Sequence, residues 1–437
     1  MLETSQAYKE WLAIEDIHNF RVRMGYRTAR SNIREDDTFG MSDIMSFEYN
    51  DACVTGSFEF GATYAKNIKF ELQNYDYKYN NYSLNGADLS LKIGLIPPEY
   101  TDIATQWLDK GRYTITEAKK SGKRYEITAV DDMIKFNIPF MPSMCRNETA
   151  EDGSPMYVTF GKLVKDICKC CGVKWSGKDF KRSGQILDKK DANNYAYPGG
   201  SCRDVIGWIA QQALGYARIN NKDELEIIEF QRAVTSETDM YGDYTGGTFT
   251  NIKNGKYSDG NNVDGGDFTT YAADEPDYLI PKKGGTYNQQ FHAINAIFGE
   301  ENIIPYPRKF TGAVVESQHG GTVEHERPVN SEYIDSVICI RGNPLLYRAT
   351  VTNAVADDLY DTYISRRYIQ YELSIPADPS REPGDVVVIT DSEGNRYCSI
   401  ILNYTFKIGS PDVISADFGL ENSDISWGQS DDAYLNN

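Results

Sequence analysis

The chain has 437 residues, 40% of them hydrophobic, which is enough for two to four domains with sizeable cores. Its 64 acidic and 45 basic residues give a net charge of −19, which argues against a protein that grips nucleic acid but not against DNA sliding past it. No apolar run approaches the roughly 20 residues that span a bilayer. The first residues lack the pattern of a signal peptide, so we expect synthesis in a cytoplasm.

Residues 1–145 are predicted to form an antiparallel β domain that begins with a short helix over 4–13. Alternating apolar residues predict strands at 18–26, 43–49, 65–72 and 89–93, followed by a hairpin over 111–130. In the third strand Ile68, Phe70 and Leu72 share one face, while Lys69 and Glu71 share the other. This pattern indicates a sheet with one buried face.

Residues 146–232 are predicted to form a small α/β unit. An apolar stripe over 157–171 indicates a helix that ends at Gly172. Ser201 and Asp204 resemble a capping box, which would begin a second helix that Gly215 closes. Apolar runs at 216–219 and 225–228, with a polar turn between them, predict a hairpin.

Residues 233–335 are rich in Gly, Asn, Asp and Tyr, and they predict an irregular, loop-rich insertion that is nevertheless ordered, because its aromatic content exceeds that of disordered segments. Residues 336–427 predict a second β domain, with one helix over 351–364, a strand over 368–375 and a terminal hairpin. Residues 428–437 are polar, and we expect a flexible tail.

The terminal hairpin over 378–409 is the clearest local pattern. Pro379 and Pro383 stop any helix, Gly384 and Asp385 make a turn, and Gly394 supplies the turn between two strands. It carries no reactive group in a catalytic setting and is interpreted as a scaffold. The hairpin over 111–130 has the same order of strand, glycine turn, Arg-Tyr and strand. This echo indicates either a structural duplication or only shared turn chemistry.

The eight cysteines show no even framework and are interpreted as reduced thiols. Only Cys168, Cys170 and Cys171 cluster, and no second pair or nearby histidine completes a zinc site. Cys168 and Cys171 fall on the apolar side of the predicted helix. Core packing is therefore the favoured interpretation.

One constellation suggests chemistry: the two histidines and two carboxylates of His319, Glu324, His325 and Glu326 could hold a metal, and Glu324 could serve as a base. The two histidines are six residues apart with glycines between them, unlike the i, i+4 pair of a metalloprotease helix, so an exposed polar turn is predicted. Two carboxylate pairs are interpreted as solvated surface: Asp131 with Asp132, and Asp357 with Asp358. We assign no catalytic, cofactor-binding or metal-binding residue and predict no enzyme.

Several stretches, in this order and spacing along most of the chain, carry a family resemblance. They are Asp-Ile-Met-Ser-Phe at 43–47, Phe-Gly-Ala at 60–62, Trp-Leu-Asp-Lys-Gly-Arg-Tyr-Thr-Ile at 107–115, residues 125–135, residues 202–217, Asn-Pro-Leu-Leu at 343–346 and Glu-Pro-Gly-Asp at 382–385. Together they resemble the central baseplate hub proteins of phage tails and related contractile injection particles. No single stretch is specific by itself.

The resemblance implies a mainly β (α+β) fold, with β-barrel hub domains at 1–145 and 336–427 and the two smaller regions inserted between them. It also implies a homotrimeric ring in which two similar barrels per chain match a sixfold tail tube on one side and a threefold spike or fibre on the other. The implied partners are the tail tube or distal tail protein, the central spike or fibre, and the tape measure protein. The implied location is the virion tail, without a cofactor and without sequence-specific binding of nucleic acid.

Two other functions stay open at this point. Some proteins of the resembled family carry a peptidoglycan-cleaving module, and a hydrolase here would use His319, Glu324 and His325. A glycan- or receptor-binding protein would use the aromatic residues of 241–271 instead. Residues 233–335 match the family pattern least, which leaves the role of this insertion undefined.

Overall fold

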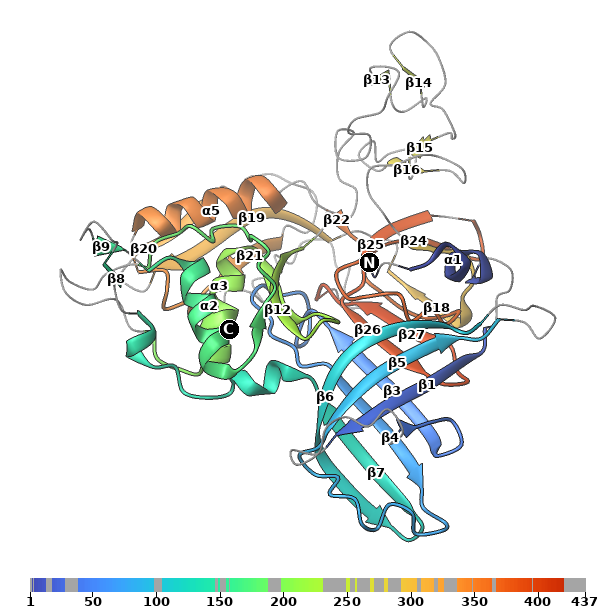
Figure 1. The fold of residues 1–437 in the computed structure, drawn as a ribbon. Helices are drawn as coiled ribbons and strands as arrows, with labels where there is room; N and C mark the ends of the chain where they lie inside the picture. Colours follow the sequence, from blue (N-terminus) through green and yellow to red (C-terminus); the bar gives the residue numbers. More distant parts are fainter. Residues whose placement is uncertain are drawn as a thin grey trace.

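The structure is a computed structural model of the chain (Figure 1). The residues that it describes are 2, 4–12, 18–27, 38–97, 104–145, 148–149, 155–156, 158–187, 198–230, 249–251, 256–257, 268–270, 279–281, 292–304, 308–317, 321–325, 336–347, 349–363, 367–394 and 396–419.

One antiparallel sheet of eleven strands organises the molecule, and it combines strands from both ends of the chain. Its strands in spatial order are β18 (Phe298–Ile303), β23 (Tyr371–Ile375), β27 (Asp412–Ala416), β26 (Asn403–Lys407), β3 (Ile44–Ala52), β4 (Asn67–Gln73), β7 (Arg124–Val130), β6 (Gln106–Ser121), β5 (Asp88–Leu95), β1 (Phe20–Arg27) and β2 (Thr38–Phe39). The mainly β prediction is therefore confirmed.

The pairing of β3 with β26 joins the two predicted β domains into this one sheet. The register runs from Asn403 opposite Ala52 to Lys407 opposite Glu48. Closure of either half into a barrel, and the domain boundaries at 145, 232, 335 and 427, remain predictions. What the described strands show is that the two halves are hydrogen-bonded neighbours rather than separate sheets.

The alternation predicted for residues 65–72 is present in β4. Ile68, Phe70 and Leu72 are almost fully buried, and Lys69 is exposed. The two predicted hairpins also form. One joins β6 to β7, and the other joins β24 (Val386–Thr390) to β25 (Arg396–Ile400). Gly122 and Gly394 take positive φ at their turns, as β-hairpin turns require.

The predicted small α/β unit contains two helices packed on a short sheet (Figure 1). Its elements are α2 (Phe160–Cys171), α3 (Cys202–Gln212), β10 (Lys174–Trp175), β11 (Gly215–Ile219) and β12 (Glu224–Glu229). Gly172 ends α2 in the left-handed conformation. The capping box is confirmed, because Asp204 N donates to Ser201 Oγ at 3.2 Å and Ser201 N donates to Asp204 Oδ2 at 2.8 Å.

The predicted role of Gly215 as the residue that closes α3 is wrong. Ala213 is the C-cap, Leu214 takes the positive φ of 56°, and Gly215 is already the first residue of β11. A glycine is needed there for a different reason, since a Cβ at Gly215 would lie 1.9 Å from the carbonyl oxygen of Ile228 on the paired strand. The glycine at position 215 is therefore required by the structure, but because the backbones of β11 and β12 approach closely there and not because it caps α3.

The remaining described elements flank these two bodies. They are α1 (Gln6–Leu12), the 3-10 turns η1 (Asp132–Phe136) and η2 (Pro142–Cys145), β8 (Glu148–Thr149), β9 (Pro155–Met156), β13 (Phe249–Asn251), β14 (Lys256–Tyr257), β15 (Phe268–Thr270), β16 (Leu279–Pro281), β17 (His292–Ile294), β19 (Arg308–Ser317), β20 (Gly321–His325), β21 (Ser336–Ile340), α5 (Ala349–Tyr363) and β22 (Arg367–Tyr368). The helix predicted at 351–364 is α5, which lies along β19 and β20 (Figure 1).

The stretch 233–335 contributes more regular structure than its composition suggests. Strand β17 pairs in parallel with β24, β18 pairs with β23, and β19 pairs in parallel with β21. These pairings place the later part of the stretch among the strands of the second β region. No helix among the described residues is long and apolar enough to cross a membrane.

Substitution of Gly215 by Ala is expected to destabilise the protein by about 2 kcal/mol or more, because β11 and β12 would have to separate to admit the methyl group. Gly184→Ala, in the same unit and with open space around its Cβ position, is the matched control and should change stability little. Chemical unfolding of both variants measures the difference, and equal midpoints would contradict the assigned contact.

Candidate functional site

The stretches that carry the family resemblance are far apart in the sequence, yet four of them meet in space. They are 60–62, 202–217, 343–346 and 382–385, and we call their meeting place the motif junction. Backbone bonds connect two of them directly, since Gly61 N donates to Gly215 O at 2.7 Å and Ala217 N donates to Ala62 O at 2.9 Å. The junction lies where the eleven-stranded sheet meets the α/β unit.

Two glycines allow the first contact of the motif junction. A Cβ at Gly61 would lie 2.6 Å from the Gly207 carbonyl oxygen, and a Cβ at Gly207 would lie 2.8 Å from the Gly61 carbonyl oxygen. Gly61 also takes a φ of +87°, which side chains other than glycine rarely adopt. Only this pair lets the 60–62 segment lie directly on α3.

Asn343 forms the second contact. Its Nδ2 donates to Trp208 O and to Gln211 Oε1, both at 2.8 Å, while its Oδ1 accepts from Leu345 N at 3.0 Å. The side chain is almost fully buried. Asn343 therefore fixes the 343–346 segment against the second half of α3, and these bonds satisfy both the amide and the carbonyl of a buried side chain.

The Glu-Pro-Gly-Asp segment forms the third contact. Tyr216 donates its hydroxyl hydrogen to Pro383 O at 2.9 Å, and a Cβ at Gly384 would lie 2.2 Å from that hydroxyl oxygen. Arg218 Nη2 approaches Glu382 Oε2 at 3.5 Å, while Arg218 Nε donates to Glu226 Oε1 at 2.8 Å. Arg218 thus bridges one carboxylate of its own unit and one from the terminal hairpin.

The carboxylates around Arg218 are largely buried, and nearby cations keep them ionised. Burial alone would raise the pKa of Glu382, but Arg218 and Lys110 outweigh it and lower that pKa to about 2. Burial likewise opposes ionisation of Glu226, and Arg218 together with Lys178 lowers its pKa. Both carboxylates are therefore ionised at neutral pH, and each depends on a cation nearby.

A second buried cluster lies beside the junction and holds the N-terminal helix. Tyr8 of α1 donates to Asp378 Oδ1 at 3.0 Å. Arg381 Nη1 lies 3.6 Å from Asp412 Oδ2, and Tyr404 donates to the same oxygen at 2.8 Å. Burial raises the pKa of Asp412 to about 7, whereas Arg381 overcomes burial at Asp378 and lowers its pKa.

Strand β17 is attached to the same turn. His292 Nε2 lies 2.9 Å from Asp385 Oδ2, and that oxygen also accepts from Glu382 N at 3.0 Å. The terminal-hairpin turn therefore holds α1 through Asp378, the α/β unit through Glu382 and β17 through Asp385. Its role as a scaffold stays a prediction, and the structure shows a buried turn with charged contacts to three separate parts of the chain.

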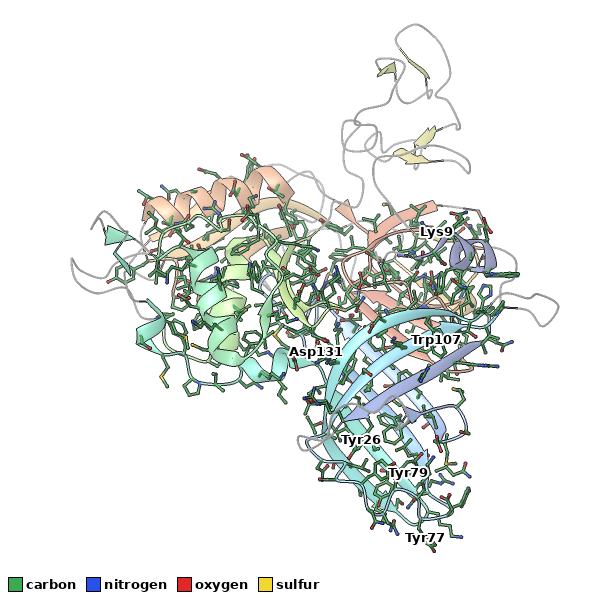
Figure 2. The ribbon with its side chains drawn as sticks, in the orientation of Figure 1. Lys9, Tyr26, Tyr77, Tyr79, Trp107 and Asp131 are labelled. Carbon is green, nitrogen blue, oxygen red and sulfur yellow. The ribbon has the colours of Figure 1, made fainter. Side chains whose placement is uncertain are left out.

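A third group of buried charges lies inside the sheet next to the junction. Asp51, Lys66, Lys110 and Asp131 are at most 6% exposed. Tyr49 donates to Asp51 Oδ2 at 2.9 Å, and Lys110 Nζ lies 5.2 Å from the centre of the Tyr49 ring. Figure 2 shows Asp131 where β7 ends and the chain turns toward the α/β unit.

Asp131 corrects the prediction that the Asp131–Asp132 pair is solvated surface, since Asp131 is 1% exposed. Its Oδ1 accepts from Met133 N at 3.1 Å and caps η1, while Oδ2 has no hydrogen-bond partner in the described structure. Burial raises the pKa of Asp131 to about 7 against the opposing charge of Lys66. An aspartate directly after a strand and before a short helical turn is a common N-cap, so the position of Asp131 could have indicated a capping role. Its charge alone suggested only a solvated surface residue.

The residues predicted as candidate ligands are not assembled into a site by the described structure. His319 lies outside the described residues, and the backbone at Glu324 and His325 belongs to strand β20, opposite Val314 and Ala313, rather than to the predicted turn. Cys168 is buried on α2, as core packing predicts. Among the described residues no group of three or more His, Cys, Asp or Glu side chains could hold a metal ion.

An open groove of about 590 Å³ lies on the sheet at the other end of β3 from Asp51. It is lined by apolar and charged side chains, including Met41, Met45, Glu117 and Lys119. The Lys407–Glu48 pair, with Nζ and Oε2 3.1 Å apart, is also part of its lining. The mixture of charges resembles an ordinary solvated sheet face more than a small-molecule site.

Comparisons with known proteins give no match by sequence and several solved structures of low similarity. No protein-family description and no curated protein matches the sequence. A 43 kDa tail protein of prophage MuSo2 from Shewanella oneidensis is 8% identical, with 91% of this chain and 97% of that chain covered at a TM-score of 0.45. The E. coli c3393 protein, a type VI secretion component described as similar to the T4 tail proteins gp27 and gp5, is 9% identical, with 90% and 76% covered at a TM-score of 0.33.

A chain of the phage P2 baseplate in its activated conformation is 10% identical, with 91% of this chain and 99% of that chain covered at a TM-score of 0.26. All three are parts of phage tails or of a secretion assembly likened to them.

Replacement of Arg218 by Met is expected to lower the free energy of unfolding by about 3 kcal/mol or more, because Glu382 and Glu226 would stay buried with too little positive charge. The matched control is Arg124→Met, which removes an exposed pair with Glu71 and should cost about 1 kcal/mol or less. Denaturant titration at neutral pH measures both. A loss at Arg218 no larger than at Arg124 would show that the junction pair is not a main support.

The raised pKa of Asp131 predicts a specific pH dependence. The folded carboxyl holds its proton more tightly than the unfolded one, so its contribution to stability is full below pH ~4 and is lost as the pH rises to about 7. Asp131→Asn keeps an oxygen that can cap Met133 but removes the titration. The free energy of unfolding of Asp131→Asn should therefore fall less steeply between these pH values than that of the wild type. The difference between the two slopes should be up to about 1.4 kcal/mol per pH unit.

Unfolding of wild type and Asp131→Asn at a series of pH values checks this difference. Asp132→Asn, a neighbour that is not deeply buried, serves as the control. Parallel curves for wild type and Asp131→Asn would contradict a raised pKa at Asp131.

Proposed function

We propose that the chain is a structural hub protein of a phage tail or phage-tail-like particle. The observation that carries the proposal is the motif junction: four stretches chosen for their resemblance to hub proteins, separated by up to 320 positions (62 to 382), interlock in space. A chance resemblance would scatter these stretches over the molecule. Their contact supports the interpretation that they are the shared framework of one fold.

The mechanical design supports a structural role. Buried ion pairs and close glycine contacts connect the sheet, the α/β unit and the terminal hairpin, and such contacts have little freedom to rearrange. A hub that joins a tail tube to a spike or fibre needs a body that keeps its shape under load. The buried charges, such as Arg218 with Glu226 and Glu382, pair with one another and so hold the segments that carry them in place. Their burial also keeps them out of reach of a substrate.

The proposed assembly is a homotrimer that forms a ring in the virion tail. Each chain would contribute two β regions, so that three chains present six similar units to a sixfold tube and three to a central spike or fibre. The further partners would be a distal tail protein and the tape measure protein. A net charge of −19 supports a bore through which DNA or the tape measure passes without being held.

Native mass spectrometry of the purified chain tests the assembly, and the expected species has the mass of three chains. A ring of this kind should bury more than ~2,000 Å² between neighbours, so dilution to the micromolar range should not dissociate it. Negative-stain images should show threefold rings. A chain that stays monomeric at high concentration and also in the presence of its tail tube protein would contradict the proposal.

A cell-wall zymogram serves as the control for the alternative of a hydrolase. The wild-type chain and His325→Ala are expected to give no clearing. Clearing by the wild type that is lost in His325→Ala would replace the structural proposal with an enzymatic one. Binding to a glycan array that is lost on deletion of residues 241–271 would instead favour a receptor-binding protein.

A further inference from the structure

One exposed sheet face, on strands β1, β5 and β6, is basic although the chain as a whole is acidic. Arg21 and Arg23 of β1 and Lys92 of β5 are exposed, and the strand register places Arg23 opposite Lys92 and Arg21 opposite Gly94. Trp107, near the start of β6, is opposite Gly94 on the other side and is 42% exposed (Figure 2). We call Arg21, Arg23, Lys92 and Trp107 the basic face.

The indole of Trp107 is held against the sheet while part of it stays exposed. A Cβ at Gly94 would lie 2.8 Å from Cε3 and 3.0 Å from Cδ2 of Trp107, so the ring lies directly over this glycine. Tryptophan and arginine are the residues most enriched at the energetic centres of protein interfaces, because their large planar side chains make many contacts. The composition of the basic face is therefore that of a protein-binding surface.

The cations of the basic face are not neutralised within the chain. Arg21, Arg23 and Lys92 make no ion pair in the part of the chain that the structure describes. Asp109 is opposite Lys92 on β6, but its Oδ1 accepts from Gly111 N at 3.0 Å. Like charges directly opposite on neighbouring strands, as at Arg23 and Lys92, destabilise an isolated sheet. A negatively charged surface that covered them would relieve this repulsion.

A complementary surface is present in the other half of the same sequence. Residues 1–232 have 33 acidic and 31 basic residues, whereas residues 233–437 have 31 acidic and 14 basic residues. Strand β18 is the end strand of the eleven-stranded sheet, and β23 is its neighbour. These two strands carry three exposed carboxylates that make no ion pair among the described residues, which we call the acidic edge: Glu300, Glu301 and Glu372.

We propose that the basic face of one chain docks on the acidic edge of a second copy of the chain. The inference rests on the proposed homotrimer, and it names the surfaces that hold neighbouring chains together. Each copy carries one surface of each kind, so the contact is heterologous, and its repetition around a threefold axis closes a ring. Guanidinium groups bind carboxylates through two parallel hydrogen bonds, which fixes the orientation of the two copies.

Charge decides between a second copy and nucleic acid as the partner of the basic face. The chain carries a net charge of −19, so most of its surface would repel a phosphate backbone that approached the few exposed cations. The same negative charge attracts the basic face of another copy. A second copy is therefore the occupant that the charge distribution favours.

Carbodiimide crosslinking of the assembled chain tests the contact, because this reagent joins lysine amines directly to carboxylates. Covalent dimers and trimers are isolated on a denaturing gel and digested for mass spectrometry. The linked peptides are expected to join Lys92 to Glu300, Glu301 or Glu372. Lys92→Arg keeps the charge but removes the reactive amine, so it should lose these peptides while the assembly persists. Covalent oligomers that lack these peptides would overturn the proposal.

Charge reversal measures the energetic weight of the same contact by analytical ultracentrifugation. Arg21→Glu combined with Arg23→Glu is expected to weaken association by about tenfold or more, because attraction to the acidic edge becomes repulsion. This variant should still fold, since residue 23 then faces Lys92 with an opposite charge. Glu300→Arg combined with Glu301→Arg should weaken association in the same way. All four changes together should restore it.

The matched control is Lys120→Glu combined with Lys123→Glu at the end of the β6–β7 hairpin. It makes the same change in charge at exposed positions near Tyr77, at the tip of the sheet away from Trp107 (Figure 2), and should leave association unchanged. Equal weakening by this control, or failure of the four changes together to restore association, would overturn the proposed contact.

The outcomes also separate this contact from the proposed hub assembly. If wild type and Arg21→Glu with Arg23→Glu form equally stable trimers, the contact is wrong while the proposed homotrimer stands. If the wild-type chain stays monomeric even beside its tail tube protein, both proposals are contradicted.

Discussion

The contact between Arg218 and the two carboxylates of Glu226 and Glu382 is the constraint on which the arrangement of this molecule depends. A buried charge is tolerated only beside an opposite charge, so Arg218 fixes the distance between the α/β unit and the terminal hairpin. The hairpin strands and β26 follow in the chain, and β26 pairs with β3. The position of the α/β unit relative to the eleven-stranded sheet is therefore fixed through the terminal hairpin and β26.

The same region contains more negative charge than its cations neutralise. Asp131 and Asp412 are both buried, and burial raises both pKa values to about 7, so each is partly protonated near neutral pH. Hydrophobic residues of similar volume would avoid this desolvation cost. Buried charged groups, however, are stable only in the few arrangements that keep an opposite charge beside them. The motif junction therefore has few alternatives to the observed packing. This specificity fits a protein that serves as a fixed platform.

The fold and the proposed function are connected by the position of the motif junction. It lies between the sheet, which would form the ring, and the α/β unit, which extends from one side (Figure 1). Forces that act on either body would pass through Gly61 and Gly207, through Asn343, and through the Arg218 pairs. A structural hub requires such continuity between its parts, and these contacts among the described residues provide it.

The sequence by itself determined the local elements: the alternation of β4, two helices together with Gly172 and the Ser201–Asp204 capping box, and both hairpins, because periodicity and turn chemistry depend only on neighbouring residues. It did not indicate that β3 pairs with β26, that Asp131 is buried, or that Gly215 is needed for contact with β12 rather than as a cap. Those features depend on residues far away in the chain, and charge alone does not distinguish a solvated aspartate from one inside a core. Only the tertiary structure decided that the turn at 378–385 is enclosed and holds three parts of the protein, since burial and pairing arise when distant segments pack together.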